Sequence, residues 1–118
     1  MQYEYFYGAQ AEQFSFYRIP KALFTEPNFR ELSTDAKVLY GILLDRMSLS
    51  LKNQWLDAQN KVYIIFTVEE IMDALNCANQ KATRLMVELE KQAGLIERKR
   101  QGLGRPNLIY VKNFAVTT

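Results

Sequence analysis

Four basic side chains surround two glycines in a short stretch near the C-terminus, residues 97–111, which reads ERKRQGLGRPNLIYV. The basic residues are Arg98, Lys99, Arg100 and Arg105, and the glycines are Gly102 and Gly104. Glycine lets the backbone turn and approach a ligand closely, whereas arginine and lysine neutralise phosphate charge. The stretch therefore has the residue types of a turn that holds a polyanion. The opposing interpretation is a soluble edge hairpin whose charges prevent aggregation.

Positive charge is concentrated in the last third of the chain. The 118 residues carry 15 Lys/Arg and 13 Asp/Glu, which gives a net charge of +2. Residues 1–75 contain seven basic and ten acidic side chains, whereas residues 76–118 contain eight and three. This uneven distribution is typical of a surface for a polyanion, although an imbalance of this size also occurs in proteins that bind no nucleic acid.

The composition argues against catalysis and against a metal or cofactor site. The chain contains no histidine, so the commonest general base near neutral pH is absent, and its one cysteine, Cys77, cannot complete an ordinary zinc site. Glu69, Glu70 and Asp73 have the spacing of a solvated acidic helix face, and no phosphate-cradling GxxxxGK motif occurs. We therefore expect a protein that is not an enzyme and uses no cofactor.

The length and hydrophobic content fit one globular domain. The chain has 118 residues, of which 48% are hydrophobic. It lacks a run of about eighteen apolar residues, and its N-terminus lacks the basic and apolar segments of a secretory signal. We expect a cytoplasmic protein.

A long helix is expected after Ser33, which is a suitable N-cap. Apolar residues then recur at helical spacing up to a fraying end near Leu51. They are Ala36, Leu39, Tyr40, Leu43, Leu44 and Met47. This stripe predicts core packing. The following segment, QWLDAQNKVYIIF, predicts a hairpin whose second strand is Val62 to Phe66.

Two shorter helices are expected next. Thr67 and Glu70 have the spacing of a capping box, which starts a helix with apolar residues at Ile71, Met72 and Leu75. A second helix runs from about Asn79 to Ala93 and ends at Gly94, which can adopt the left-handed conformation. Two short helices joined by a tight turn predict a helix-turn-helix.

The second of these helices separates into a core face and an outward face. Its core positions are Ala82, Leu85, Met86, Leu89 and Ala93. The outward positions are Gln80, Arg84, Val87 and Lys91, flanked by Lys81 and Thr83. The N-terminal half of a recognition helix meets base edges in the major groove, and this half is nearly free of acid. A solvated helix face is the alternative, and Val87 either packs against a neighbouring element or contacts a thymine methyl.

A strand, a basic loop and a returning strand follow directly. Leu95 and Ile96 begin the first strand, and Leu108 to Val111 form the second. This order predicts a winged helix, an α+β fold with a small antiparallel sheet whose hairpin, the wing, lies along the phosphate backbone or reaches a minor groove. Strand alternation places Arg98 and Arg100 on one face, and Arg105 at the turn is the wing residue that we most expect to contact DNA.

Three segments carry a family resemblance: YRIPKALF, LSTDAKVLYGILLDRMSLSLKN and GLIERKRQGLGRPNLIYVKNF. They resemble the N-terminal domain of the RepA plasmid replication-initiator family over roughly residues 14–114. The resemblance implies sequence-specific binding of double-stranded origin repeats as a homodimer to initiate replication. It also implies a separate C-terminal region, similar to DnaD-type proteins, that recruits host replication proteins, so we expect this chain to be a fragment.

The same resemblance implies specific site residues. The family's recognition helix falls on Asn79 to Glu90 and its wing on Arg98 to Asn107. The expected DNA-binding residues are Asn79, Gln80, Lys81, Thr83 and Arg84 in the helix, and Arg98, Lys99, Arg100, Gly102, Gly104, Arg105 and Asn107 in the wing. Two positions depart from expectation: Ala78 is a poor helix cap, and Asn60 stands where the earlier hairpin suggests glycine.

The domain boundaries leave two flanking segments, an aromatic arm at 1–13 and a tail at 115–118, around a DNA-binding domain at 14–114. In the arm, Tyr3, Tyr5, Phe6 and Tyr7 alternate imperfectly, so they either add a strand at a subunit interface or are disordered. We favour self-association. Two other functions remain open: a transcriptional repressor with the same fold, which includes autoregulation, and a winged-helix module that binds proteins through its sticky arm.

Overall fold

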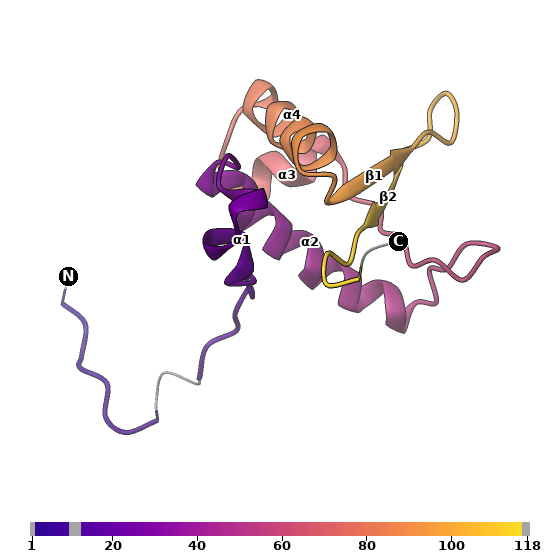
Figure 1. Ribbon diagram of the computed structural model, residues 1–118. Coiled ribbons are helices and arrows are strands. Elements are labelled where there is room, and N and C mark those ends of the chain that lie inside the picture. Colours follow the sequence, from indigo (N-terminus) through magenta and orange to yellow (C-terminus); the bar gives the residue numbers. More distant parts are fainter. Residues whose placement is uncertain (1, 10–12, 117–118) are drawn as a thin grey trace.

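Residues 2–9 and 13–116 are described in a computed structural model of the chain, so residues 1, 10–12 and 117–118 of the predicted arm and tail lie outside it. The helices pack together and the small sheet lies at one side of them (Figure 1). The N-terminal arm extends away from this body, and the loop between the two strands projects from it in another direction (Figure 1).

The longest helix, α2 (Thr34–Lys52), begins and packs as predicted. The hydroxyl oxygen of Ser33 accepts a hydrogen bond from the Ala36 amide at 3.1 Å, which caps the helix. Of the six predicted apolar positions, Ala36, Leu39, Tyr40 and Leu43 are buried, whereas Leu44 and Met47 are partly buried against the same core. Before it lie the short α1 (Ala22–Thr25) and the 3₁₀ turn η2 (Pro27–Phe29), which bury Leu23 and Phe29.

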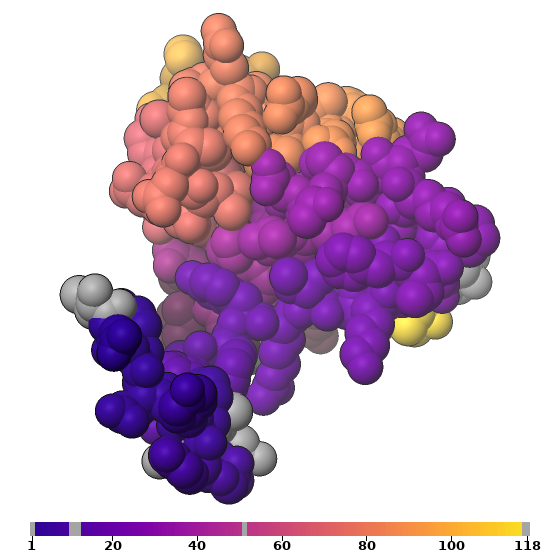
Figure 2. All heavy atoms as spheres, turned by 90° about the vertical axis from the view of Figure 1, so that its left-hand side faces the viewer, coloured from indigo at the N-terminus to yellow at the C-terminus, as the bar shows by residue number. Residues whose placement is uncertain are grey.

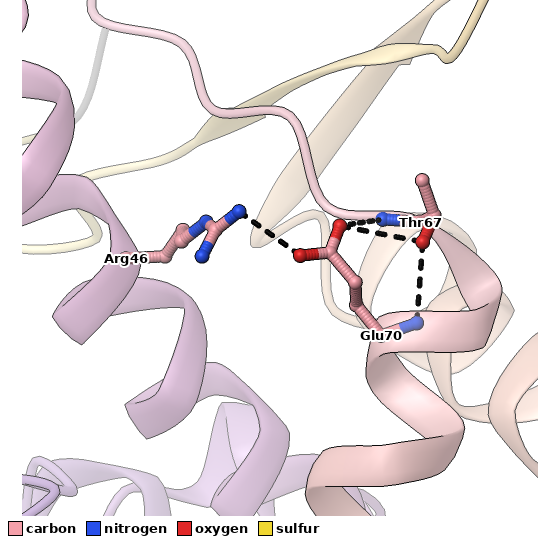
Figure 3. Close-up of polar contacts among 3 residues, drawn as sticks. All are labelled: Arg46, Thr67 and Glu70. Atoms are coloured by element: carbon pink, nitrogen blue, oxygen red, sulfur yellow. Dashed lines mark hydrogen bonds and ion pairs between the residues drawn. The ribbon is translucent and has the colours of Figure 1, made fainter.

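The predicted capping box is present at the start of α3 (Val68–Leu75). The Glu70 amide donates to the Thr67 hydroxyl at 3.2 Å, and the Thr67 amide donates to the Glu70 carboxylate at 3.0 Å. The other carboxylate oxygen accepts from Arg46 of α2 at 3.0 Å (Figure 3). One glutamate therefore both starts α3 and ties it to the long helix.

The next helix, α4 (Asn79–Val87), starts at the predicted residue, but its α-helical part is shorter than predicted. Residues 88–92 form a π-helical turn, η3 (Glu88–Gln92), before Gly94 ends the segment with φ +65°. The sequence prediction of one α-helix to Ala93 was wrong in this respect. Because α and π turns use the same residue types, apolar periodicity does not distinguish them, and long-range hydrogen bonds of Glu88 and Glu90 accompany the wider turn.

The wing consists of β1 (Ile96–Lys99) and β2 (Leu108–Val111), which pair antiparallel with Ile96 opposite Val111. Ile64 adds one further bridge, because it exchanges both backbone hydrogen bonds with Ile109 at 2.9 Å. Helix, turn, helix and hairpin thus follow in the predicted order. The fold is a winged helix of the α+β class, as the sequence indicated.

The predicted earlier hairpin is reduced to a loop with isolated bridges, so the expected strand Val62 to Phe66 was wrong. Leu56 pairs with Val62 at a single bridge. The Asp57 carboxylate accepts from the amides of Gln59 and Lys61 at 2.8 and 2.9 Å, and these local bonds form a turn in place of a ladder. Asn60 adopts φ +65°, so it takes the conformation for which glycine was expected.

Aromatic packing closes the core at the C-terminal side. The ring of Phe114 contacts Phe29 and Tyr40 at centroid distances of 5.3 and 6.0 Å. The Tyr40 hydroxyl donates to the Lys112 carbonyl at 2.7 Å, and burial raises the pKa of Tyr40 to about 12. Among the described residues, no helix has the length and apolar content needed to span a membrane.

Candidate nucleic-acid interface

The outward face of α4 is polar and basic, as its periodicity predicted. Asn79, Gln80, Thr83 and Arg84 are exposed, whereas Ala82, Leu85, Met86 and Leu89 are buried in the core. Val87 is 40% exposed, so this valine is partly accessible from solvent rather than covered by a neighbouring element. Ala78 precedes the helix without a side-chain capping bond, yet α4 still begins at Asn79. The face that meets solvent is therefore the one that sequence reasoning assigned to base recognition.

Lys81 differs from its neighbours on this face because it forms an ion pair. Its ammonium nitrogen lies 2.6 Å from the carboxylate of Asp35, in the first turn of α2. Both side chains remain about half exposed, at 42% and 49%. An ion pair in such a position contributes at most about 1 kcal/mol, so Lys81 is restrained without being buried.

The basic loop of the wing has a defined turn at its tip. The Arg105 amide donates to the Gly102 carbonyl at 3.3 Å, and the Gln101 side chain donates to the Pro106 carbonyl at 2.8 Å. Gly104 has φ +75° at the third position of this turn, which is the value that a type II turn requires there. Gly102 has φ +119°, a conformation that side chains rarely adopt. The two glycines are therefore explained by the backbone path.

Three of the predicted wing cations are exposed: Lys99, Arg100 and Arg105. Asn107 is exposed as well, and with Arg105 it lines a groove of about 300 Å³ between the wing and the start of α3. No ion pair is found for these three cations in the part of the chain that the structure describes. They are available to a phosphate without loss of an internal partner.

Arg98 is the exception among the predicted wing residues, since the structure pairs it with Glu90. Its guanidinium donates to one carboxylate oxygen of Glu90 at 2.8 and 3.0 Å, and its amide donates to the other at 3.0 Å. Both side chains are largely buried, with 25% and 16% exposed. Arg98 therefore joins the wing to η3, a contact that the sequence alone did not reveal.

All three acidic residues of the basic last third are held by protein groups. Glu88 accepts from the amide and hydroxyl of Ser33 at 2.8 and 2.9 Å, and Glu97 lies 3.8 Å from Lys112. Burial opposes ionisation of Glu90, but the hydrogen bonds and charge of Arg98 outweigh it and lower the pKa of this carboxyl. Within described residues 76–116, five basic side chains have no ion pair: Arg84, Lys91, Lys99, Arg100 and Arg105.

Helix α4 and the wing loop lie away from the N-terminal arm (Figure 1). In Figure 1, α4 and the wing loop both lie in the upper half, and the arm extends below them. In Figure 2, from another direction, the arm lies low and the residues of α4 lie high. A ligand that contacts α4 and the wing together would leave the arm uncovered.

One exposed residue at this surface escaped the sequence analysis. Leu103 stands at the wing tip with an exposed fraction of 102%. The sequence does indicate this exposure, because a leucine between two glycines cannot be shielded by its immediate neighbours. The prediction for this loop considered its charges only.

Comparisons with known proteins cover nearly the whole chain. Residues 15–118 match the family described as "Replication initiator protein A (RepA) N-terminus". A curated relative, a "41 kDa protein" from Lactobacillus helveticus, is 32% identical over 92 residues. The match covers 78% of this chain but only 26% of that protein, so the chain spans about a quarter of its relative.

Solved structures give the same picture. One described as "Structure of Rep-DNA complex" is 39% identical, with a TM-score of 0.79 over 98% of this chain and 88% of its own. Another, "N-Terminal domain of DNA binding protein", is 39% identical with a TM-score of 0.77 over 95% and 85%. A third, "Structure of MDR initiator", is 40% identical with a TM-score of 0.76 over 97% and 89%.

The first prediction concerns the contact between Glu90 and Arg98. Glu90→Gln should lower the free energy of unfolding by about 1–3 kcal/mol near neutral pH, because it removes a charged partner from three hydrogen bonds. A lowered pKa means that the contribution is present above the ordinary value of 4.5 and is lost as pH falls through the folded-state value. Urea unfolding of the wild type and of Glu90→Gln should therefore show a difference in the free energy of unfolding that becomes smaller at acidic pH.

Glu97→Gln is the matched control, because its carboxylate is 59% exposed and lies 3.8 Å from Lys112. It should leave the free energy of unfolding almost unchanged. Equal losses for the two variants would show that Glu90 holds the wing no better than a surface glutamate does.

Proposed function

The chain belongs to the RepA_N family, the N-terminus of replication initiator protein A, and from this membership we propose that it binds double-stranded origin repeats of a plasmid to initiate replication. The observation that carries the proposal is the joint surface of α4 and the wing, which presents exposed polar groups and cations that have no ion pair among the described residues. A solved relative described as a Rep-DNA complex supports DNA as the ligand.

The two parts of this surface have different tasks in the proposal. Asn79, Gln80, Thr83 and Arg84 of α4 read base edges in the major groove, since side chains of these types match the donors and acceptors there. Lys99, Arg100 and Arg105 of the wing neutralise phosphates, and the glycines let the loop approach the DNA backbone. The role is binding, and none of these residues is assigned a catalytic step.

The proposal also concerns the longer proteins in which domains of this family occur. A chain that spans 26% of a curated relative leaves room in such a protein for a further region. The family resemblance assigns that region the recruitment of host replication proteins in the cytoplasm. Autoregulation uses the same DNA-binding surface, so footprints on origin and promoter DNA would distinguish it from initiation.

The second prediction tests base reading by Arg84. Arg84→Ala should weaken binding to the cognate duplex by roughly 1–3 kcal/mol and should reduce discrimination against a scrambled duplex. Arg30→Ala is the control, because Arg30 is also exposed but lies outside α4 and the wing. Competition binding measures both effects. Equal losses on cognate and scrambled DNA would make Arg84 a phosphate contact.

The third prediction tests phosphate contact by Arg105. Arg105→Ala should lower affinity for cognate and scrambled duplexes alike and should flatten the slope of log K against log salt by about 0.9 for each phosphate lost. Binding is measured from low to moderate salt, with Arg30→Ala again as control. Parallel curves with unchanged affinity would identify the basic loop as a solvated edge hairpin.

We further propose that the aromatic arm mediates self-association into a dimer. Tyr3, Tyr5, Phe6 and Tyr7 are 60–85% exposed, and no strand forms in the described part of the arm, residues 2–9. The ring of Phe14 contacts those of Phe6 and Phe16 edge to face, at centroid distances of 6.0 and 6.3 Å. These exposed rings lie away from α4 and the wing, so pairing through the arm leaves the DNA-binding surface open (Figure 2).

The fourth prediction follows from that arrangement. Deletion of residues 1–12 should shift the molar mass from dimer towards monomer in light scattering and should leave the affinity for a single repeat nearly unchanged. An unchanged molar mass would exclude the arm from the interface.

A further inference from the structure

The wing tip presents one fully exposed apolar side chain, that of Leu103. Leu103 is 102% exposed, whereas Leu49, Leu56 and Val87 elsewhere on the surface are 40–45% exposed. Its two neighbours are glycines, and an added Cβ at either would meet no atom within 4 Å. The leucine therefore projects from bare backbone.

The tip holds this side chain outward by its own hydrogen bonds. Leu103 occupies the second position of the turn closed by the Arg105 amide and the Gly102 carbonyl at 3.3 Å. The bond of 2.8 Å from Gln101 to Pro106 closes the loop behind that turn. Turn positions ordinarily carry polar residues, so the site is an unfavourable place for a leucine unless a partner covers it.

The chemistry around the leucine indicates which partner covers it. Arg100 and Arg105 flank the tip, and within the described residues neither has an ion pair. An apolar protrusion between free cations suits a nucleic-acid groove, where phosphates line both edges and base faces lie at the floor. An anionic lipid surface or an acidic protein surface offers similar chemistry, so the choice of DNA as the partner rests on the DNA-binding function proposed above for α4 and the wing.

We infer that Leu103 enters the minor groove beside the recognition helix and inserts at a base step as an apolar wedge, while the flanking arginines hold the phosphates. This inference rests on the proposed DNA-binding function and adds a specificity determinant to it. Insertion partly unstacks the step and is easiest at flexible pyrimidine–purine steps. The wing thus favours particular flanking sequences without hydrogen bonds to their bases.

The first experiment compares how wild-type protein and its variants, each as the whole chain, bind the repeat identified by footprinting. Leu103→Ser should lower affinity about tenfold, since the burial of one leucine is lost. It should keep the salt slope of the wild type, unlike Arg105→Ala, because no charge is removed. Leu103→Met should restore binding, and Leu49→Ala, which truncates a leucine on α2, should have no effect. Circular dichroism checks that each variant is folded.

The second experiment measures base unstacking in the DNA. A 2-aminopurine base replaces adenine at each step of the repeat and its flanks in turn, and its fluorescence rises when the base is unstacked. Saturating wild-type protein should brighten one step on the wing side, and saturating Leu103→Ser should not. If Leu103→Ser bound with wild-type affinity and produced the same rise in fluorescence, the inference would be overturned, while the proposed DNA-binding function would remain.

Two other results would also overturn it, and they differ from each other. Loss of cooperative binding to two adjacent repeats with normal binding to one would make Leu103 a contact between protein copies. Failure of the wild-type chain to bind any duplex would remove the proposed function and the inference together.

Discussion

The carboxylate of Glu90 is the point on which the geometry of the candidate DNA-binding surface depends. It accepts three hydrogen bonds from Arg98, at 2.8 to 3.0 Å, and thereby joins η3 to the first strand of the wing. Because η3 continues α4 without a break, this glutamate helps to orient the wing relative to α4, together with the bond of 2.8 Å from the Leu95 amide to the Leu89 carbonyl. A hydrogen-bonded arginine of this kind fixes direction as well as distance.

Contacts of the acidic residues also affect how charge is distributed in the last third of the chain. Glu88, Glu90 and Glu97 are the acidic residues of the last third, and each is held by Ser33, Arg98 or Lys112. Two of these acids, Glu88 and Glu90, are thus largely buried in structural contacts, whereas Glu97 stays exposed beside Lys112. Within described residues 76–116, the cations that have no ion pair lie in α4, η3 and the wing, where their positive charges reinforce one another. A modest net charge of +2 conceals this local concentration.

Local signals in the sequence predicted most of the fold. The Thr67 and Glu70 pair, the stripe of α2 and Gly94 each act within a few residues, so their outcome depends little on the rest of the chain. The π-helical turn and the absence of a strand at Val62 to Phe66 were not predictable in this way. Both depend on hydrogen bonds whose partners are chosen by tertiary packing or by competition from a side chain such as Asp57.

For the site residues too, local patterns predicted exposure but did not predict tertiary partners. Exposure of Gln80, Thr83 and Arg84 followed from helical periodicity, and exposure of Arg105 followed from the turn. Partners of Lys81 and Arg98 lie 46 and 8 residues away in sequence, and the spacing of charges does not indicate them. Leu103 was overlooked because the wing was interpreted through its charges alone.

The two ion pairs of predicted DNA-binding residues have opposite consequences for binding. Lys81 and Asp35 are about half exposed, so water already screens their attraction, and exchanging Asp35 for a phosphate costs little. Arg98 and Glu90 are largely buried, and separating them would leave a carboxylate without its partner in a poorly hydrated place. In the proposed complex Lys81 would therefore exchange Asp35 for a phosphate at little cost, with Asp35 left as a nearby negative charge. Arg98 is held in the wing by this pair, and the phosphate contacts that we propose fall to Lys99, Arg100 and Arg105.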